Sequence, residues 1–231
     1  MKTPIASRPR ILRDDLRYLI FTEVFRRFTE PKKSRRAFAL IETAIDCFDR
    51  KGFGAVTFVM VARSAGLSRQ ALHRYFKNIE DLREVSLKYI RLLGQKMALE
   101  RIGDSKDPVE LLSGYVSVHF LWAKTYRSHA RVWLSFLSSC AHKNKDRAIN
   151  SAAVTAGHER IIQIIEQGKK AGVFQCADPN LSAKVVQSLL TGWTLSLITE
   201  ELPDEDQQTA AVLQQCLSAA GYDASPARAS V

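Results

Sequence analysis

Apolar residues recur at helical spacing along nearly the whole chain, and this periodicity limits the possible folds more than any other feature. Between residues 35 and 51, for example, Phe38, Ile41, Ile45 and Phe48 fall on one face of a helix. No segment alternates apolar and polar residues over the length of a strand, and no Asn-Gly or Asp-Gly turn joins two β-branched runs. The sequence therefore predicts an all-α protein.

Turn residues divide this pattern into separate helices. Gly52 and Gly172 stand where helices should end, whereas Pro108 and Pro179 stand where helices should begin, because proline is accepted in a first helical turn. The expected helices span residues 11–29, 35–51, 58–65, 68–76, 80–100, 108–126, 130–141, 146–171, 179–200 and 205–220.

Positive charge is concentrated in the first part of the chain. The protein has 34 Lys and Arg against 24 Asp and Glu, and residues 1–100 hold the entire net charge of +10. Such an excess in one region favours a polyanionic partner such as nucleic acid, although a solvated basic surface would give the same count.

The composition is that of a globular protein, with 231 residues of which 46% are hydrophobic. Polar residues interrupt the richest apolar stretch, and the basic N-terminus lacks the apolar segment of a signal peptide. We therefore expect a soluble cytoplasmic protein with no membrane partner. The four cysteines show no metal-binding spacing, so we expect reduced thiols and no metal or other cofactor.

Residues 58–77 have the features of a helix-turn-helix. Ala62 and Ala65 are small enough for two short helices to cross closely, and Gly66 suits the turn between them. Ser68 can cap the second helix through its hydroxyl group. The polar residues expected on the outward face of that helix are Arg69, Gln70, His73 and Arg74. In the major groove of DNA, arginine can read guanine and glutamine can read adenine.

The residues around this motif resemble the DNA-binding domain of the tetracycline-repressor (TetR) family. The resemblance covers about residues 34–90 through three motifs. These are the F-x-x-x-G-F-x-x-x-T entry (Phe48, Gly52, Phe53, Thr57), the A-x-x-A-G-(V/L)-S turn (Ala62 to Ser68), and the exit at Leu72, His73, Tyr75 and Phe76 followed by K-N-x-E-D-L. The family's fold implies an N-terminal helix-turn-helix DNA-binding domain and a larger helical bundle for ligand binding and dimerisation.

This organisation predicts four regions of the chain. They are an N-terminal extension with an extra helix and a basic linker (1–33), the helix-turn-helix domain (34–82), the bundle (83–220) and a disordered tail (221–231). The extra helix either packs against the body or a partner subunit, or reaches around DNA as an arm.

The resemblance also implies which residues contact DNA. Thr57 would touch a phosphate, and Arg69, Gln70 and Ala71 would face base edges. The full expected set is Arg35, Arg36, Thr57, Ser68, Arg69, Gln70, Ala71, His73, Arg74, Tyr75 and Lys77.

Two residues depart from the family pattern. His73 stands in place of a tyrosine, and Ile79 stands in place of a lysine that commonly binds phosphate. His73 can still donate a hydrogen bond to a phosphate, and Arg35, Arg36 or the basic linker can replace the lysine.

Aromatic residues in the bundle are candidates for a small-molecule site. Tyr115, His119, Trp122 and Tyr126 are spaced by four, three and four residues, which places them on one flank of a helix. The expected set also includes Trp133, Phe136 and His158. An aromatic pocket with a few polar groups suits a small-molecule effector, although an ordinary core can show the same spacing.

The last two expected helices are rich in small and apolar residues, as an interface of four helices from two subunits requires. Packing within one subunit would use the same residue types. With the homodimer that the resemblance implies, the expected interface residues are Val186, Leu189, Gly192, Trp193, Leu213 and Leu217.

Together with the resemblance, these features predict a homodimeric transcriptional regulator, and the family's usual behaviour implies a repressor that a small molecule releases from a pseudo-palindromic DNA operator. The chain has no Gly-rich phosphate loop, HExxH or GxSxG motif, so we do not expect an enzyme. Two alternatives remain: a small-molecule-binding helical protein with weak or non-specific DNA binding, and a protein that coats DNA without regard to sequence.

Overall fold

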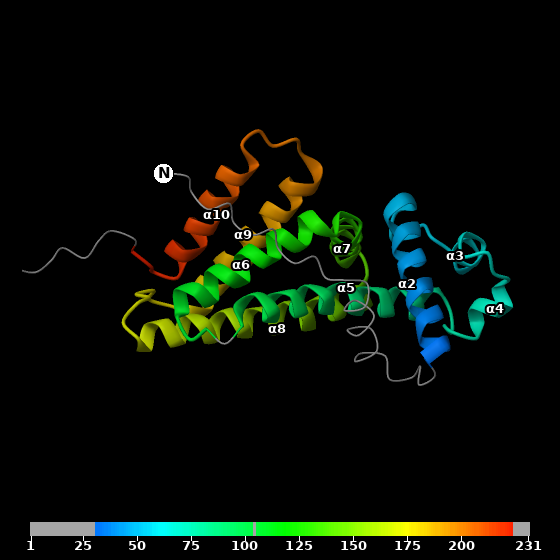
Figure 1. Ribbon diagram of the computed structural model, residues 1–231, viewed down its shortest axis with the longest axis horizontal. Helices are drawn as coiled ribbons and strands as arrows, with labels where there is room; N and C mark the ends of the chain where they lie inside the picture. The colour runs from blue at the N-terminus through cyan, green and yellow to red at the C-terminus, as the bar shows by residue number, and fades with distance from the viewer. Residues whose placement is uncertain (1–30, 104, 224–231) are drawn as a thin grey trace, which may run out of the picture.

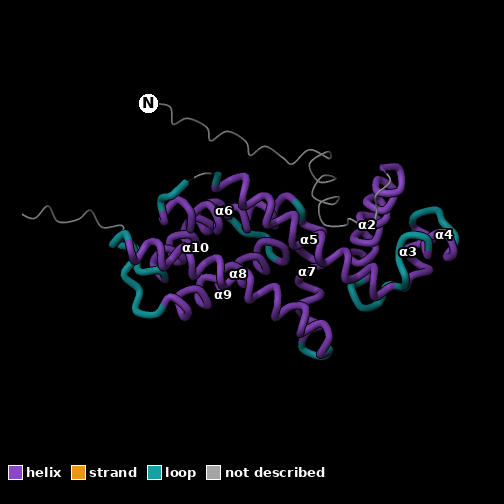
Figure 2. Tube along the Cα trace, turned by 90° about the horizontal axis from the view of Figure 1, so that it is seen from below, coloured by secondary structure: helices purple, strands orange, loops and turns teal. Residues whose placement is uncertain are grey.

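The computed structural model describes residues 31–103 and 105–223, and every regular element within these ranges is an α-helix. The molecule is elongated, with α3 and α4 at one end and the bundle at the other (Figures 1 and 2). The all-α prediction is confirmed. The helices are α2 (Pro31–Lys51), α3 (Phe58–Ser64), α4 (Arg69–His73), α5 (Ile79–Ile102), α6 (Pro108–Thr125), α7 (Arg127–Cys140), α8 (Asn144–Lys170), α9 (Pro179–Thr199) and α10 (Glu205–Ala219).

Two expected helix limits are wrong. The segment expected as a basic linker is the first part of α2, which begins at Pro31 because the fixed φ of proline suits a first helical position. At the other end of the domain, α4 stops at His73, so the residues from Arg74 to Lys77 form a turn. The helix expected over residues 11–29 lies outside the described residues, as does most of the expected tail.

Local capping explains why α3 and α4 form at these positions. The Thr57 hydroxyl accepts a hydrogen bond from the backbone N–H of Met60, and the Ser68 hydroxyl accepts one from that of Ala71, at 3.3 and 3.1 Å. Gly66 has a φ of +66°, which favours glycine, and it ends α3 at the turn. The helix-turn-helix is therefore specified by short-range contacts.

Two helices join the helix-turn-helix to the bundle. Helix α5 runs without a break through the boundary expected after residue 82. Helix α7 packs against α2, where Arg131 donates two hydrogen bonds to the carboxylate of Asp49 at 2.6 and 2.7 Å. The backbone N–H of Phe53 donates to the hydroxyl of Ser135 on α7, at 3.3 Å. The two parts are thus held in one orientation by packed helices and paired charges.

Among the described helices, none is long and apolar enough to cross a membrane.

Candidate DNA-binding surface and ligand cavity

The start of α4 presents the side chains expected to read DNA. Arg69 and Gln70 are exposed, as are Arg74 and Lys77 in the turn that follows. No acidic residue occurs between residues 57 and 79, and the carboxylate of Asp81 at the start of α5 accepts a hydrogen bond from the backbone N–H of Lys77 at 2.9 Å. A basic, exposed surface of this kind suits a phosphate backbone.

The side chain of His73 makes its contacts within the helix-turn-helix. Its ring packs on Phe58 of α3 with centroids 4.6 Å apart, and its Nε2 accepts a hydrogen bond from Nε of Arg69 at 3.4 Å. The histidine therefore positions the Arg69 side chain and couples α4 to α3. The terminal nitrogens of Arg69 make no described contact and can point to a base edge.

One other expected contact residue has a structural role, and two residues outside the expected set also help to shape this surface. Arg36 donates to the backbone carbonyl of Ala65 at 3.4 Å, where it holds α2 against the turn. Ile79 is partly buried against the core, which explains an apolar residue at a position where the family commonly has lysine. Val59 of α3, which is not in the expected set, is 45% exposed two residues after Thr57. That each expected residue contacts DNA remains a prediction.

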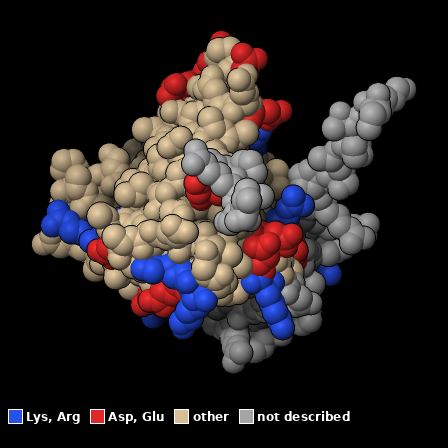
Figure 3. Space-filling view, turned by 90° about the vertical axis from the view of Figure 1, so that its left-hand side faces the viewer, with Lys and Arg blue, Asp and Glu red and all other residues tan. Residues whose placement is uncertain are grey.

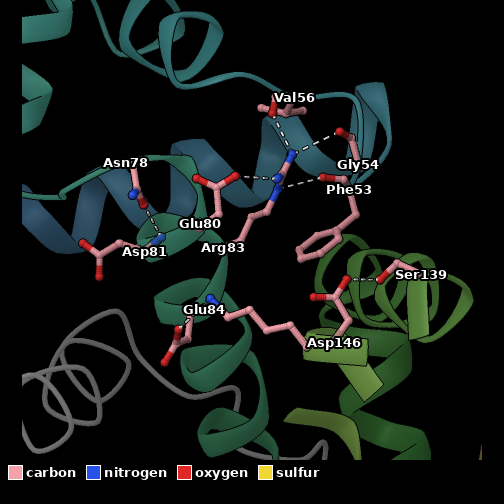
Figure 4. Close-up of polar contacts among 11 residues, drawn as sticks. Phe53, Gly54, Val56, Asn78, Glu80, Asp81, Arg83, Glu84, Ser139 and Asp146 are labelled. Atoms are coloured by element: carbon pink, nitrogen blue, oxygen red, sulfur yellow. Dashed lines mark hydrogen bonds and ion pairs between the residues drawn. The ribbon is translucent and has the colours of Figure 1, made fainter. Parts of the chain in front are cut away.

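Arg83 shapes the loop that leads into α3. From α5 its guanidinium donates hydrogen bonds to the carbonyls of Phe53, Gly54 and Val56 at 3.2, 3.0 and 2.9 Å (Figure 4). It lies beside Glu80 at 3.5 Å and over the ring of Phe53. One cation thus satisfies three carbonyls of a loop without regular structure. Local sequence patterns do not reveal this role, because the partners are 27 to 30 residues away along the chain.

Replacing Arg83 by methionine is expected to lower the free energy of unfolding by about 3 kcal/mol, because three carbonyls lose a charged donor. Chemical denaturation measures the loss. Arg101→Met removes an exposed arginine from the same helix and should leave stability nearly unchanged. Equal stability of the two variants would contradict the role given to Arg83.

The bundle contains a cavity of about 180 Å³, partly open to solvent, between helices α5 to α9. Its wall is mostly apolar and aromatic, with a few polar side chains, as in small-molecule sites. The lining residues are Ile90, Arg91, Gly94, Gln95, Ala98, Tyr115, Val118, His119, Trp122, Trp133, Leu137, Asn150, Val154, Gly157, Gln187 and Thr191.

Four of the expected pocket residues line this cavity: Tyr115, His119, Trp122 and Trp133. The other three expected residues lie elsewhere. Phe136 is fully buried one turn along α7 from Trp133, whose ring lies 5.3 Å away, and it also packs against Phe53 at 5.7 Å between ring centroids. Tyr126 is buried at the end of α6 beside His129, and His158 follows Gly157 on α8 without reaching the cavity wall.

The aromatic wall of the cavity is electrically neutral at physiological pH. Burial lowers the pKa of His119 to about 4, and its Nε2 lies 3.0 Å from the hydroxyl of Thr194 on α9. Burial also raises the pKa of Tyr115, and the charge of Arg160 partly opposes that rise. Both side chains therefore act as neutral hydrogen-bonding groups.

Acid is expected to weaken the fold through His119. The unfolded imidazole takes up a proton near pH 6.5, whereas the folded one resists it down to about pH 4. Stability is therefore present above pH 6.5 and is lost as pH falls from 6.5 towards 4, by about 2 kcal/mol at roughly pH 5. Urea unfolding of the protein and of His119→Gln at neutral and mildly acidic pH tests this. If the unfolding free energies of the two proteins fell equally between neutral and mildly acidic pH, the assignment of this loss to His119 would be wrong.

The expected dimer residues divide into two groups. Val186 and Leu217 are buried in the core of their own subunit, so the prediction that they face a partner is wrong. Trp193 is half-buried and donates from Nε1 to the hydroxyl of Thr209 on α10 at 3.2 Å. Leu189 and Leu213 are also half-buried.

A different set of apolar side chains, which forms a stripe along α9, is exposed to solvent. Of the four large hydrophobic side chains that are exposed in the described residues, three lie on this helix, namely Leu181, Val185 and Leu195, at 59, 42 and 49%. Gly192 is exposed between the last two. Acidic side chains gather at the α9–α10 turn, at the edge of a broad uncharged surface (Figure 3).

Family models match both parts of the chain. Residues 40–85 match bacterial regulatory proteins of the tetR family, and residues 108–220 match the C-terminal domain of BetI-type transcriptional repressors. The chain belongs to the TetR family. It is a helix-turn-helix transcriptional regulator of this family, with a C-terminal domain of the BetI type.

A curated member of the TetR family is similar along much of the chain. The HTH-type transcriptional regulator BetI of Serratia proteamaculans is 25% identical over 163 residues, which cover 69% of this chain and 79% of the relative. Against two further BetI regulators the chain spans 57% and 60% of their length.

Solved TetR-family structures share the fold. A transcriptional regulator from Saccharomonospora viridis in complex with choline has a TM-score of 0.71 at 21% identity, over 82% of this chain and 97% of that one. AibR in complex with isovaleryl coenzyme A and operator DNA has a TM-score of 0.64 at 20% identity, over 78% and 97%.

Proposed function

We propose that the protein is a homodimeric repressor whose affinity for an operator is controlled by a small molecule bound in the bundle. Two copies of α4 would enter successive major grooves of an inverted repeat, about 34–36 Å apart. The observation that carries this proposal is the pairing of an exposed, basic helix-turn-helix with a cavity in the attached bundle. The cytoplasm, where the DNA lies, is the place of action.

Two helices connect the cavity to the DNA-binding domain, which supports control by a ligand. Helix α7 lines the cavity with Trp133 and Leu137. Arg131 and Phe136 of the same helix contact α2 and the loop after it. Helix α5 contacts that loop through Arg83 and lines the cavity further along. A ligand that shifts either helix would change the spacing of the two recognition helices.

The relatives support both halves of the proposal. BetI-type repressors supply the domain type, and one structural neighbour holds isovaleryl coenzyme A and operator DNA together. A second neighbour holds choline, so ligands of opposite charge occur on this fold. The ligand of this chain must therefore be inferred from its own cavity.

Selection of bound fragments from a random duplex library, at physiological salt, tests the proposal. The expected result is an enriched inverted repeat whose half-sites lie about one helical turn apart. Fragments without a common motif would indicate a non-specific DNA binder and would overturn the proposed site-specific repressor.

A further inference from the structure

Two buried polar atoms of the cavity lack partners. Within the described residues, Nε1 of Trp122 and the side-chain oxygen of Asn150 make no hydrogen bond, and both residues line the cavity. Trp122 is only 6% exposed. Buried polar groups are nearly always paired in folded proteins, because an unpaired one loses its hydration without compensation. These two atoms therefore point to a bound molecule with one acceptor and one donor.

The charge in the cavity wall has one sign. Arg91 of α5 lines the cavity and forms no ion pair with an acidic residue of the described ranges, and no Asp or Glu is among the lining residues. The indole of Trp122 packs against Gly94, where an added Cβ would lie 3.7 Å from the ring. Gly94 follows Arg91 by three residues, so the two positions are neighbours on the helix face. The unpaired N–H donor therefore lies against the face of α5 that carries Arg91 one turn away.

The size of the cavity limits the ligand. A cavity of about 150 Å³ lined by aliphatic and aromatic residues is known to hold benzene, and the cavity here has about 180 Å³. It accommodates one ring, or an apolar group of that size, with short substituents. Gly157 contributes to this space, because a Cβ there would approach Oε1 of Gln187 to 3.2 Å.

We propose that the effector is a small organic acid with a ring-sized apolar body and a hydroxyl group. Its carboxylate accepts from Arg91 and from Nε1 of Trp122, and its hydroxyl donates to the side-chain oxygen of Asn150. The aromatic residues Tyr115 and Trp133 enclose the apolar body. This inference rests on the proposed function in taking the cavity as the effector site. The proposed ligand class excludes quaternary ammonium compounds. Their positive charge would lie beside that of Arg91, and no carboxylate lines the cavity to neutralise either charge.

Calorimetric titration of the full chain without DNA tests the ligand class. The probes are para-hydroxybenzoate and para-hydroxyphenylacetate, the methyl ester of each, choline and benzyltrimethylammonium. We expect at least one acid to bind at least about tenfold more tightly than its ester, and the two ammonium compounds not to bind. Tighter binding of an ammonium compound, equal binding of acid and ester, or no binding of either acid would overturn the inference.

Variants assign the contacts. Arg91→Gln should weaken acid binding at least about tenfold and leave ester binding unchanged, whereas Arg91→Lys should retain part of the acid preference. Trp122→Phe should weaken acid and ester together, because both offer an acceptor to the lost N–H. The matched control Arg101→Gln removes an exposed arginine from the same helix and should change neither. Acid binding that is insensitive to Arg91→Gln would overturn the inference even if the acids bind.

The failure of this inference is distinguishable from failure of the proposed function. Operator binding is measured separately by gel shift, with and without each probe. Loss of the acid preference in a protein that still binds an inverted repeat overturns the ligand class alone. An acid that binds through Arg91 without releasing the operator supports the ligand class and contradicts the proposed control of DNA binding.

Discussion

Replacing Arg69 and Gln70 together by alanine is expected to reduce the preference for the operator over random DNA at least about a hundredfold. Each bidentate contact between such a side chain and a base contributes roughly 1–3 kcal/mol of discrimination. Both side chains are exposed at the start of α4, and the double variant removes no capping group, because Ser68 and Thr57 stay in place. The fold should therefore persist while the reading of bases is lost.

The measurement compares affinities for the selected operator and for a scrambled duplex over a range of salt concentrations. Lys77→Ala is the matched control, because it removes one exposed cation in the turn after α4. It should weaken binding to both duplexes alike and reduce the slope of affinity against salt by about one ion per subunit, or about two for the dimer. If the double variant behaved like Lys77→Ala, the assignment of Arg69 and Gln70 as base-reading residues would be wrong.

The helix-turn-helix could be predicted from sequence because its determinants are local. The turn at Gly66 and the caps at Thr57 and Ser68 act within three or four residues of the chain. Arg83 could not be assigned in the same way. Its partners belong to a loop that only the packing of α5 against the domain brings within reach.

The cavity was predicted only in part for a related reason. Spacing places Tyr115, His119 and Trp122 on one flank of α6. It does not show over what length of α6 the neighbouring helices are far enough away to leave a cavity. Tyr126 continues the same flank and is buried where the helix ends. Gly94 and Gly157 help to form the cavity because they lack side chains. A glycine of this kind contributes nothing to the hydrophobic periodicity from which the helix faces were predicted.

The dimer face illustrates how a one-residue difference changes the outcome. Val185 and Val186 are equally apolar, but successive residues of a helix point about 100° apart. Val186 is fully buried in its own subunit, whereas Val185 is 42% exposed. Apolar character alone therefore could not decide which residue meets a partner, and the rotation of α9 against the bundle does.

Replacing Val185 and Leu195 together by aspartate is expected to convert the dimer into monomers and to lower operator affinity about a thousandfold. The two side chains lie on the exposed stripe of α9, so two carboxylates there would have to be buried unpaired in a two-subunit interface. A monomer engages one half-site at a time and loses the high effective concentration that links the second, which is worth about 10²–10⁴ in affinity.

Sedimentation equilibrium and gel shift with the selected operator give the two results. Arg127→Asp is the control, because it adds a carboxylate at the exposed first residue of α7, a position where acidic residues are favoured. Thermal melting of both proteins checks that the subunit fold survives, as it should, since Val185 and Leu195 are not core residues. If the double variant remained dimeric, the proposal that the interface lies on α9 would be wrong. A monomer with full operator affinity would instead contradict the requirement for two linked recognition helices.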